Sequence, residues 1–254
     1  GLNLPISSQS GAVFPGNALV TDGKIKPPRF PDQFGSWFVY TMPFIEQSNL
    51  YDRWDFSQRD FANANGPNSV AAVIVPLFLC PSDIAESQTT YLTGGVTYYF
   101  GANSYVANAG VRSWFIANAT FDGVFQINSK TKFAEITDGL SNTILLSERY
   151  HFDPEWPDLP NHRGWGWANY LAPQDHFGGA LQPINYRLPL GSGPEPDYSL
   201  QDNRLSSFSS GHSGGANAAL ADGSVRFLTS SSAGRRVPTS SGTSVDAAAS
   251  MSSS

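Results

Sequence analysis

An Asp-Gly pair within residues 216–227 (ANAALADGSVRF) restricts the fold more than any other feature of this sequence. The pair lies between two short runs in which apolar residues alternate with small or polar ones. Because a two-residue type I′ turn needs positive φ at both positions, Asp-Gly in this setting predicts a tight β-hairpin. Pairing outward from the turn sets Leu220 opposite Val225 and Ala218 opposite Phe227. These four residues then share one apolar face, so we expect a half-buried antiparallel hairpin.

His212 precedes this hairpin and Asp222 begins its turn, which raises the question of a catalytic or metal-binding pair. The extended residues 216–221 between them span roughly 20 Å. A shared hydrogen bond or metal ion needs a separation several-fold shorter. We therefore expect His212 in a glycine-rich loop and Asp222 in the turn, at opposite ends of one strand.

The other patterns favour an α+β fold in which an N-terminal helical part packs on a mainly antiparallel sheet. Residues 36–51 carry apolar side chains at near-helical spacing, and Pro43 predicts either a kink or two short helical pieces within them. Shorter apolar runs predict a short helix over 68–76 and a buried strand over 77–80. Clusters of Thr, Tyr, Val and Phe separated by Gly and Asn predict three or more short strands over 89–126.

We expect a single globular domain over residues 1–229. Within it, the prolines and glycines of 1–35 predict an irregular, docked leader. Residues 151–204 are dense in Pro and Trp and have little periodicity, which predicts long ordered loops. Residues 230–254 are rich in serine and poor in apolar side chains, which predicts a flexible tail.

The charge balance argues against a nucleic-acid-binding surface. The net charge is −6, the isoelectric point is about 5.1, and no basic run is longer than Arg235-Arg236. Charged residues make up only 14% of the chain, and this turn-rich composition is common outside the cytoplasm. Cys80 is the only cysteine, so no intrachain disulfide forms.

No run approaches the roughly 18 consecutive apolar residues of a membrane span. The chain begins at Gly1 rather than at Met, from which we expect a processed or trimmed product that has lost an export or anchoring segment.

Enzyme signals are missing. The common hydrolase and nucleotide-binding motifs do not occur, and the four histidines have no metal-ligand spacing, so we expect no zinc or iron site. A carboxylate-dependent hydrolase is kept as an alternative, because its paired carboxylates leave no local signature. Its candidate residues are Glu46, Asp83, Glu135 and Glu148. Each is more simply a cap, a turn or an ion-pair residue, so we expect a protein that is not an enzyme.

A turn at Asp138-Gly139, followed by an extended segment over 143–150, suggests a calcium site. Asp138, Ser141, Asn142 and main-chain carbonyls of the turn supply hard oxygen ligands, and either Glu148 or Asp222 would join them from a neighbouring strand. The alternative is a plain turn stabilised by Asx hydrogen bonds, because the spacing is not that of an EF-hand.

Four aromatic residues of the 151–204 region suggest a binding platform for glycans or a partner. They are Trp156, Trp165, Trp167 and Tyr170. The alternative is that these rings cover the sheet beneath a long loop.

The sequence resembles the prepilin-type H-X9-DG family, which is abundant in planctomycete bacteria. The resemblance is carried by VFPG (13–16), SWFVYTMPFIEQSNLYDRWDF (36–56), FLCPSD (78–83), DGVF (122–125), ITDGLSNTILLSE (136–148) and FSSGHSGGANAALADGSVRFL (208–228). Any one motif is weak, but six in the same order are highly specific. The H-X9-DG motif itself, called the naming motif below, falls on His212, Asp222 and Gly223, which become candidate binding residues.

The resemblance implies an exported, pseudopilin-like protein with an α+β head outside the membrane. It carries no catalytic residues, and calcium sites in related pseudopilins support an ion at the Asp138 turn. The prepilin stretch and hydrophobic helix of the family are absent here, and the serine-rich end replaces its usual apolar segment. Any membrane attachment would run through that missing segment.

From these observations we expect an extracytoplasmic structural subunit of a surface filament or secretion apparatus. It would act through protein contacts, including self-association. An extracellular glycan-binding module is the first alternative.

Overall fold

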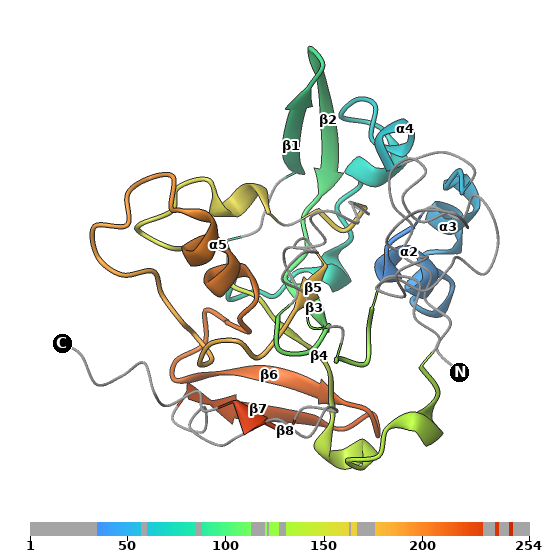
Figure 1. Cartoon of the computed structure of the whole chain (residues 1–254). Coiled ribbons are helices and arrows are strands. Elements are labelled where there is room, and N and C mark those ends of the chain that lie inside the picture. The colour runs from blue at the N-terminus through green and yellow to red at the C-terminus, as the bar shows by residue number, and fades with distance from the viewer. Residues whose placement is uncertain are drawn as a thin grey trace, which may run out of the picture.

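A five-stranded sheet forms the framework of the computed structural model (Figure 1). Its strand order is β5-β3-β4-β6-β7, and all neighbours are antiparallel except the parallel pair β3 and β5. The strands are β3 (Tyr105–Asn108), β4 (Ile144–Glu148), β5 (Phe177–Gly178), β6 (Gly215–Leu220) and β7 (Val225–Thr229). The structure describes residues 35–56, 60–84, 88–112, 120, 122–126, 131–162, 164–166, 176–230, 237–238 and 244–245. The predicted α+β class is confirmed.

The N-terminal helical part is broken where the sequence predicts a kink. Helix α2 (Trp37–Thr41) passes into the 3₁₀ helix η1 (Met42–Phe44), and α3 (Ser48–Arg53) follows. Pro43 lies within η1, where its missing N–H and fixed φ suit a short turn but would interrupt a continuous α-helix. Further short helices include α4 (Asp60–Asn63), η4 (Phe133–Glu135) and η5 (Leu140–Asn142).

The main core lies between the helical part and the sheet. Trp37 and Phe38 of α2 are buried in one cluster with Ala107 of β3 and Phe177 of β5. The Trp37 indole also donates a hydrogen bond to the carbonyl of His176, at 2.9 Å. Burial of each large side chain contributes roughly 1.5–3 kcal/mol, so this cluster anchors the helices against the sheet.

A separate hairpin of β1 (Gln88–Thr93) and β2 (Val96–Gly101) projects from the body of the protein (Figure 1). Thr93 pairs with Val96, so the turn consists of Gly94 and Gly95 alone. Their φ values of 57° and 77° are the two positive angles of a type I′ turn. With β1, β2 and β3, the expectation of three or more strands over 89–126 is confirmed.

The predicted strand over 77–80 is wrong. In place of the short helix predicted over 68–76 and this strand, the structure has two single helical turns. These turns are η2 (Val70–Ala72) and η3 (Pro76–Phe78), both 3₁₀. Pro76 opens η3, where its fixed φ favours a turn and it supplies no N–H for a sheet ladder. Cys80 follows as a buried residue outside any strand.

The hairpin over 216–227 exists, but its predicted register is wrong by one residue. Ala219 pairs with Val225 and Asn217 with Phe227, so the turn contains three residues, 221–223. Only Gly223 has positive φ, at 86°, whereas a type I′ turn needs two such residues. This three-residue turn with glycine in the left-handed region matches the usual alternative to the two-residue hairpin.

The register change moves apolar side chains to the other face of the sheet. The alternation along β6 buries Ala218 and Leu220, but Val225 and Phe227 lie on the opposite face and are 67% and 47% exposed. A shift of one residue has this effect because side chains alternate with a period of two. The single apolar face expected from the sequence is therefore divided between two faces.

The described part of residues 151–204 is mostly irregular, but it contains a helix that the sequence pattern missed. Helices η6 (Leu159–Asn161) and α5 (Tyr198–Leu205) lie in this region. Asp197 caps α5 by accepting a hydrogen bond from the N–H of Leu200 at 3.0 Å. The helix buries Asp202 and Arg204 as well as Leu205, so no apolar stripe marks it in the sequence.

The predicted leader, 1–35, lies outside the described residues except for Gly35. Of the predicted tail, Ser230 and two short strands are described, β8 (Val237–Pro238) and β9 (Ser244–Val245), which pair with each other. Within the described ranges, none of the helices has the length and apolar character needed to cross a membrane.

Candidate functional site

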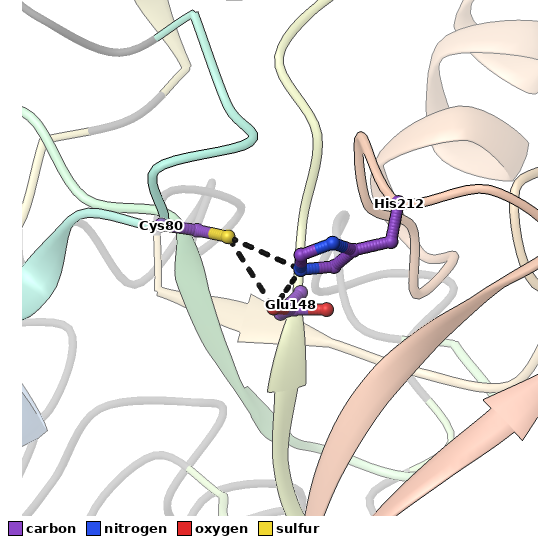
Figure 2. A group of neighbouring side chains, drawn as sticks. All are labelled: Cys80, Glu148 and His212. Carbon is purple, nitrogen blue, oxygen red and sulfur yellow. Dashed lines mark hydrogen bonds and ion pairs between the residues drawn. The ribbon is translucent and has the colours of Figure 1, made fainter.

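Three segments that are distant in the sequence converge at the carboxyl end of β4. They bring together Cys80, which follows η3, Glu148, the last residue of β4, and His212, in the loop before β6 (Figure 2). Glu148 Oε1 lies 3.2 Å from His212 Nε2 and 3.4 Å from Cys80 Sγ, and Cys80 Sγ lies 3.6 Å from His212 Nε2. Cys80 and Glu148 are buried, and the His212 side chain is 38% exposed. The cluster is therefore reachable from solvent through the imidazole.

Backbone contacts between the segments hold this cluster together. The N–H of Ser209 donates to the carbonyl of Glu148 at 2.9 Å. Gly211 lies so close to the loop after Cys80 that an added Cβ would be 2.0 Å from the carbonyl oxygen of Ser82. Only glycine permits that approach. Gly211, the first glycine of the GHSGG string, therefore allows His212 to lie close to the cysteine.

Asn217 fixes the orientation of the Glu148 carboxylate. Its backbone N–H donates to Oε2 at 2.7 Å, and its side-chain amide donates to Oε1 at 3.1 Å. Tyr105 pairs with Glu148 across the β3–β4 ladder, and burial, followed by the nearby Cys80 and Glu148, raises the pKa of Tyr105 to about 12. Oε1 thus faces the imidazole while Oε2 is held by the backbone.

Burial raises the pKa of the Cys80 thiol above its ordinary value, and the proximity of Glu148 raises it further. Hydrogen bonds with Ser82, whose hydroxyl is 3.1 Å from the sulfur, partly offset this increase. A cysteine nucleophile instead needs a lowered pKa. In addition, the thiol and the carboxylate approach the same imidazole nitrogen, whereas a catalytic relay places them on different nitrogens.

Asp222, the second residue of the naming motif, is not part of the cluster. It lies in the turn beyond the other end of β6, and its Oδ1 accepts hydrogen bonds from the N–H and hydroxyl of Ser224 at 2.9 and 2.7 Å. These hydrogen bonds lower the pKa of the exposed Asp222 carboxyl. Together with Gly223, it makes the turn, while His212 contributes its side chain to the cluster.

The structure does not bring Glu148 together with the other proposed calcium ligands. Asn142 donates through its side chain to the backbone carbonyl of Asp138 at 3.1 Å, which closes a turn that includes Ser141. Glu148 lies at the far end of β4 from this turn and contacts His212 instead. Five strand residues at about 3.4 Å each separate the two ends, so Glu148 is not available as a ligand for an ion at Asp138.

The aromatic platform is also not formed by the rings that the structure describes. Trp165 is fully buried in the main core, and Trp156 is buried in a second cluster with Leu159, Leu188 and Leu205. Neither ring offers a face to a glycan. Trp167 and Tyr170 lie outside the described residues.

The four candidate carboxylates of a hydrolase lie in different surroundings. Glu46 and Glu135 are exposed, and Glu135 accepts a hydrogen bond from the N–H of Lys132 at 2.7 Å. Asp83 and Glu148 are each bound to a different histidine.

A second polar network adjoins the cluster, three residues further along two of the same segments. Asp83 Oδ2 lies 2.8 Å from His151 Nδ1, and Asp83 Oδ1 accepts the backbone N–H of His151 at 3.1 Å. Burial opposes ionisation of Asp83, but the contacts with His151 outweigh it and hold the pKa below its usual value. His151 Nε2 faces the carbonyl of His162 at 3.1 Å, which extends the network to the end of η6.

His162 is expected to make stability depend on pH. Burial lowers its pKa from 6.5 to about 4, although Asp158 partly offsets the effect. Between these values the unfolded chain binds a proton that the folded chain does not, so the free energy of unfolding should fall as the pH falls, by up to about 3 kcal/mol in all. Denaturant titrations from pH 7 to pH 4 measure this. His162→Gln should flatten the slope in that window, and an equal slope in both proteins would refute the assignment.

Comparison with known proteins finds one family. The family model SBP_bac_10, described as "Protein of unknown function (DUF1559)", matches residues 8–234. The match includes all three segments of the cluster. No curated protein and no solved structure matches the chain.

Proposed function

This chain belongs to the DUF1559 family of proteins of unknown function, and we propose that it is a non-enzymatic structural subunit outside the cytoplasm that assembles with further copies of itself. The observation that carries the proposal is the edge strand β7 of the five-stranded sheet, which pairs only with β6 among the described residues.

Strand β7 lies at the edge of the sheet and directs part of its backbone away from β6. It is the last strand of the sheet on its side, and among the described residues it pairs only with β6. The N–H of Ser230 donates to the carbonyl of Gly214 at 2.8 Å. Because antiparallel ladders alternate, the N–H and C=O groups of Val225 and Phe227 point away from β6.

The side chains of this edge favour a protein partner. Val225 and Phe227 lie on one face of β7, and both are exposed. A soluble protein usually protects such an edge with charged residues, a bulge or a covering segment. Addition of a strand from a second copy would satisfy the outward backbone groups and cover both apolar side chains.

The location and the pseudopilin-like role rest on the ordered motifs of the H-X9-DG type and on the low charged fraction of 14%. The non-enzymatic assignment is supported by the geometry at His212, where the thiol and the carboxylate converge on one nitrogen. This arrangement lacks the relay of a nucleophile, a base and an orienting acid.

Self-association of the whole chain is the test. We expect sedimentation velocity over a wide concentration range to show concentration-dependent oligomers, and electron microscopy to show whether they are filaments. Phe227→Lys places a charge on the β7 edge and should shift the protein toward monomer.

Leu190→Lys provides the matched control, because Leu190 is 96% exposed in a loop outside the sheet. It should associate like the original chain, and equal melting temperatures would show that both variants remain folded. A chain that stays monomeric at the highest concentration, or a Phe227→Lys variant that associates normally, would contradict the proposal.

A further inference from the structure

We propose that Cys80, Glu148 and His212 bind one transition-metal ion of the zinc class. Figure 2 shows the thiol, one carboxylate oxygen and one imidazole nitrogen pointing toward a common point. The three atoms lie within 4.8 Å of one another and come from three different residue types. No local motif announces the site, because Glu148 is 68 residues from Cys80 and 64 from His212 in the sequence.

The distances between the ligand atoms fit tetrahedral coordination. Zinc lies about 2.0 to 2.1 Å from nitrogen and oxygen ligands and about 2.3 Å from sulfur, so tetrahedral angles separate the ligand atoms by roughly 3.3 to 3.6 Å. The observed separations are 3.2 Å for N and O, 3.4 Å for S and O, and 3.6 Å for S and N. The three side chains are already spaced as ligands without a rearrangement of the loops.

The donor set selects the class of metal. A thiolate and an imidazole are preferred by zinc and similar transition metals, whereas calcium and magnesium prefer oxygen ligands throughout. Only Glu148 supplies oxygen in this cluster. The cluster is therefore chemically distinct from the calcium site suggested by the Asp138 turn.

The residues around the cluster hold its side chains in place, as expected for a preformed metal site. Both oxygens of Glu148 are held by Asn217, an outer contact that fixes the carboxylate while Oε1 faces the cluster. Gly211 permits the loop that carries His212 to approach the loop that carries Cys80. Three protein ligands leave a fourth tetrahedral position, and the partly exposed His212 marks the side on which water or another group could occupy it.

A metal ion here would join the three segments to which the ligands belong, and so would stabilise the folded chain. This inference does not rest on the proposed self-association. A monomeric chain that binds zinc would support the metal site and contradict the assembly, and an assembling chain without zinc binding would do the reverse.

The test uses the full chain after treatment with a chelator, with Zn²⁺ alone as the added ion. Isothermal titration should give one ion per chain, and zinc at 100-fold excess over its dissociation constant should raise the melting temperature by about 5–10 °C. Addition of Co²⁺ should produce a thiolate-to-cobalt charge-transfer band, which reports bonding to the Cys80 sulfur.

Two ligand variants and one control complete the design. Cys80→Ser should abolish the charge-transfer band, and His212→Gln should weaken zinc binding by more than about tenfold. Asp222→Asn changes the other residue of the same sequence motif and should bind zinc normally. Melting temperatures without metal show whether each variant is folded.

Three results would overturn the metal site. They are failure of the original chain to bind zinc in a one-to-one ratio, unchanged zinc affinity in folded Cys80→Ser and His212→Gln, and stabilisation by Ca²⁺ but not by Zn²⁺.

Discussion

Replacement of Asp153 by Asn is expected to lower the free energy of unfolding by about 3–5 kcal/mol, because it leaves a buried arginine without its counter-charge. Asp153 Oδ2 lies 3.1 Å from Arg204 Nε, and both side chains are 0% exposed. Burial lowers the pKa of Arg204 to about 10, and Asp153 is the main contact that opposes this decrease. The guanidinium stays charged at neutral pH. The cost of burying this charge can therefore be offset only by the groups around it.

Those groups cannot replace the carboxylate. Arg204 also donates to the backbone carbonyl of Tyr150 at 2.7 Å, but a carbonyl carries no net charge. Asp153 accepts a further hydrogen bond from the N–H of Leu188 at 3.2 Å through the same oxygen that faces Arg204. In Asp153→Asn, one carboxylate oxygen becomes an NH₂ group, which donates rather than accepts hydrogen bonds. The variant therefore loses both the negative charge and hydrogen-bond acceptors.

Urea or guanidinium titrations at pH 7 measure this effect, and Asp138→Asn serves as the matched control. Asp138 is exposed, so the same chemical change should alter stability by less than about 0.5 kcal/mol. Equal midpoints for the two variants would show that the Asp153–Arg204 pair does not stabilise the fold.

Replacement of Trp165 by Ala is expected to cost about 3–5 kcal/mol, as for other large core residues. Its side chain is fully buried, and its ring lies 5.7 Å from that of Trp54 and 6.2 Å from that of Phe78. The indole also donates to the carbonyl of Val73 at 2.8 Å. Alanine would leave a cavity between the helical part and the sheet, and would remove the hydrogen bond to the partly buried carbonyl of Val73.

The same titrations measure this loss, with Leu190→Ala as the control. Leu190 is 96% exposed, so its truncation should change stability by no more than about 0.5 kcal/mol. A Trp165→Ala protein with nearly unchanged stability would mean that this ring is not part of the core, and would reopen its use as a binding surface.

Local patterns predicted the features that depend on neighbours in the chain. Pro43 predicted the break after α2, because the effect of proline on a helix is confined to about one turn. The β-type clusters over 89–126 predicted three or more strands, because strand and turn preferences also act over a few neighbouring residues. The helix α5 escaped prediction because it buries Asp202 and Arg204, whose partners lie in other segments.

The candidate site was only partly visible in the sequence. His212 was selected from its motif and Glu148 as a ligand for a different ion, but nothing connected either residue to Cys80. The signal that could have drawn attention to the cysteine is its position in the FLCPSD motif, as the only cysteine of the chain. Spacing rules describe ligands on one local element, whereas these three residues belong to three separate segments.

The string GHSGGANAALADGSVRF shows where the two levels of information separate. Its composition predicted a hairpin correctly, since turn and strand preferences act over a few residues. Only the tertiary structure determined the register, because the sequence pattern is compatible with a two-residue or a three-residue turn. The three-residue turn places Val225 and Phe227 on the exposed face.

Only the tertiary structure determined the partners of His212 as well. Cys80 and Glu148 reach it only because β4 and β6 pair in one sheet and Gly211 lets the loop of Ser82 approach. Short-range preferences therefore identify the elements, while packing between distant segments determines which side chains meet.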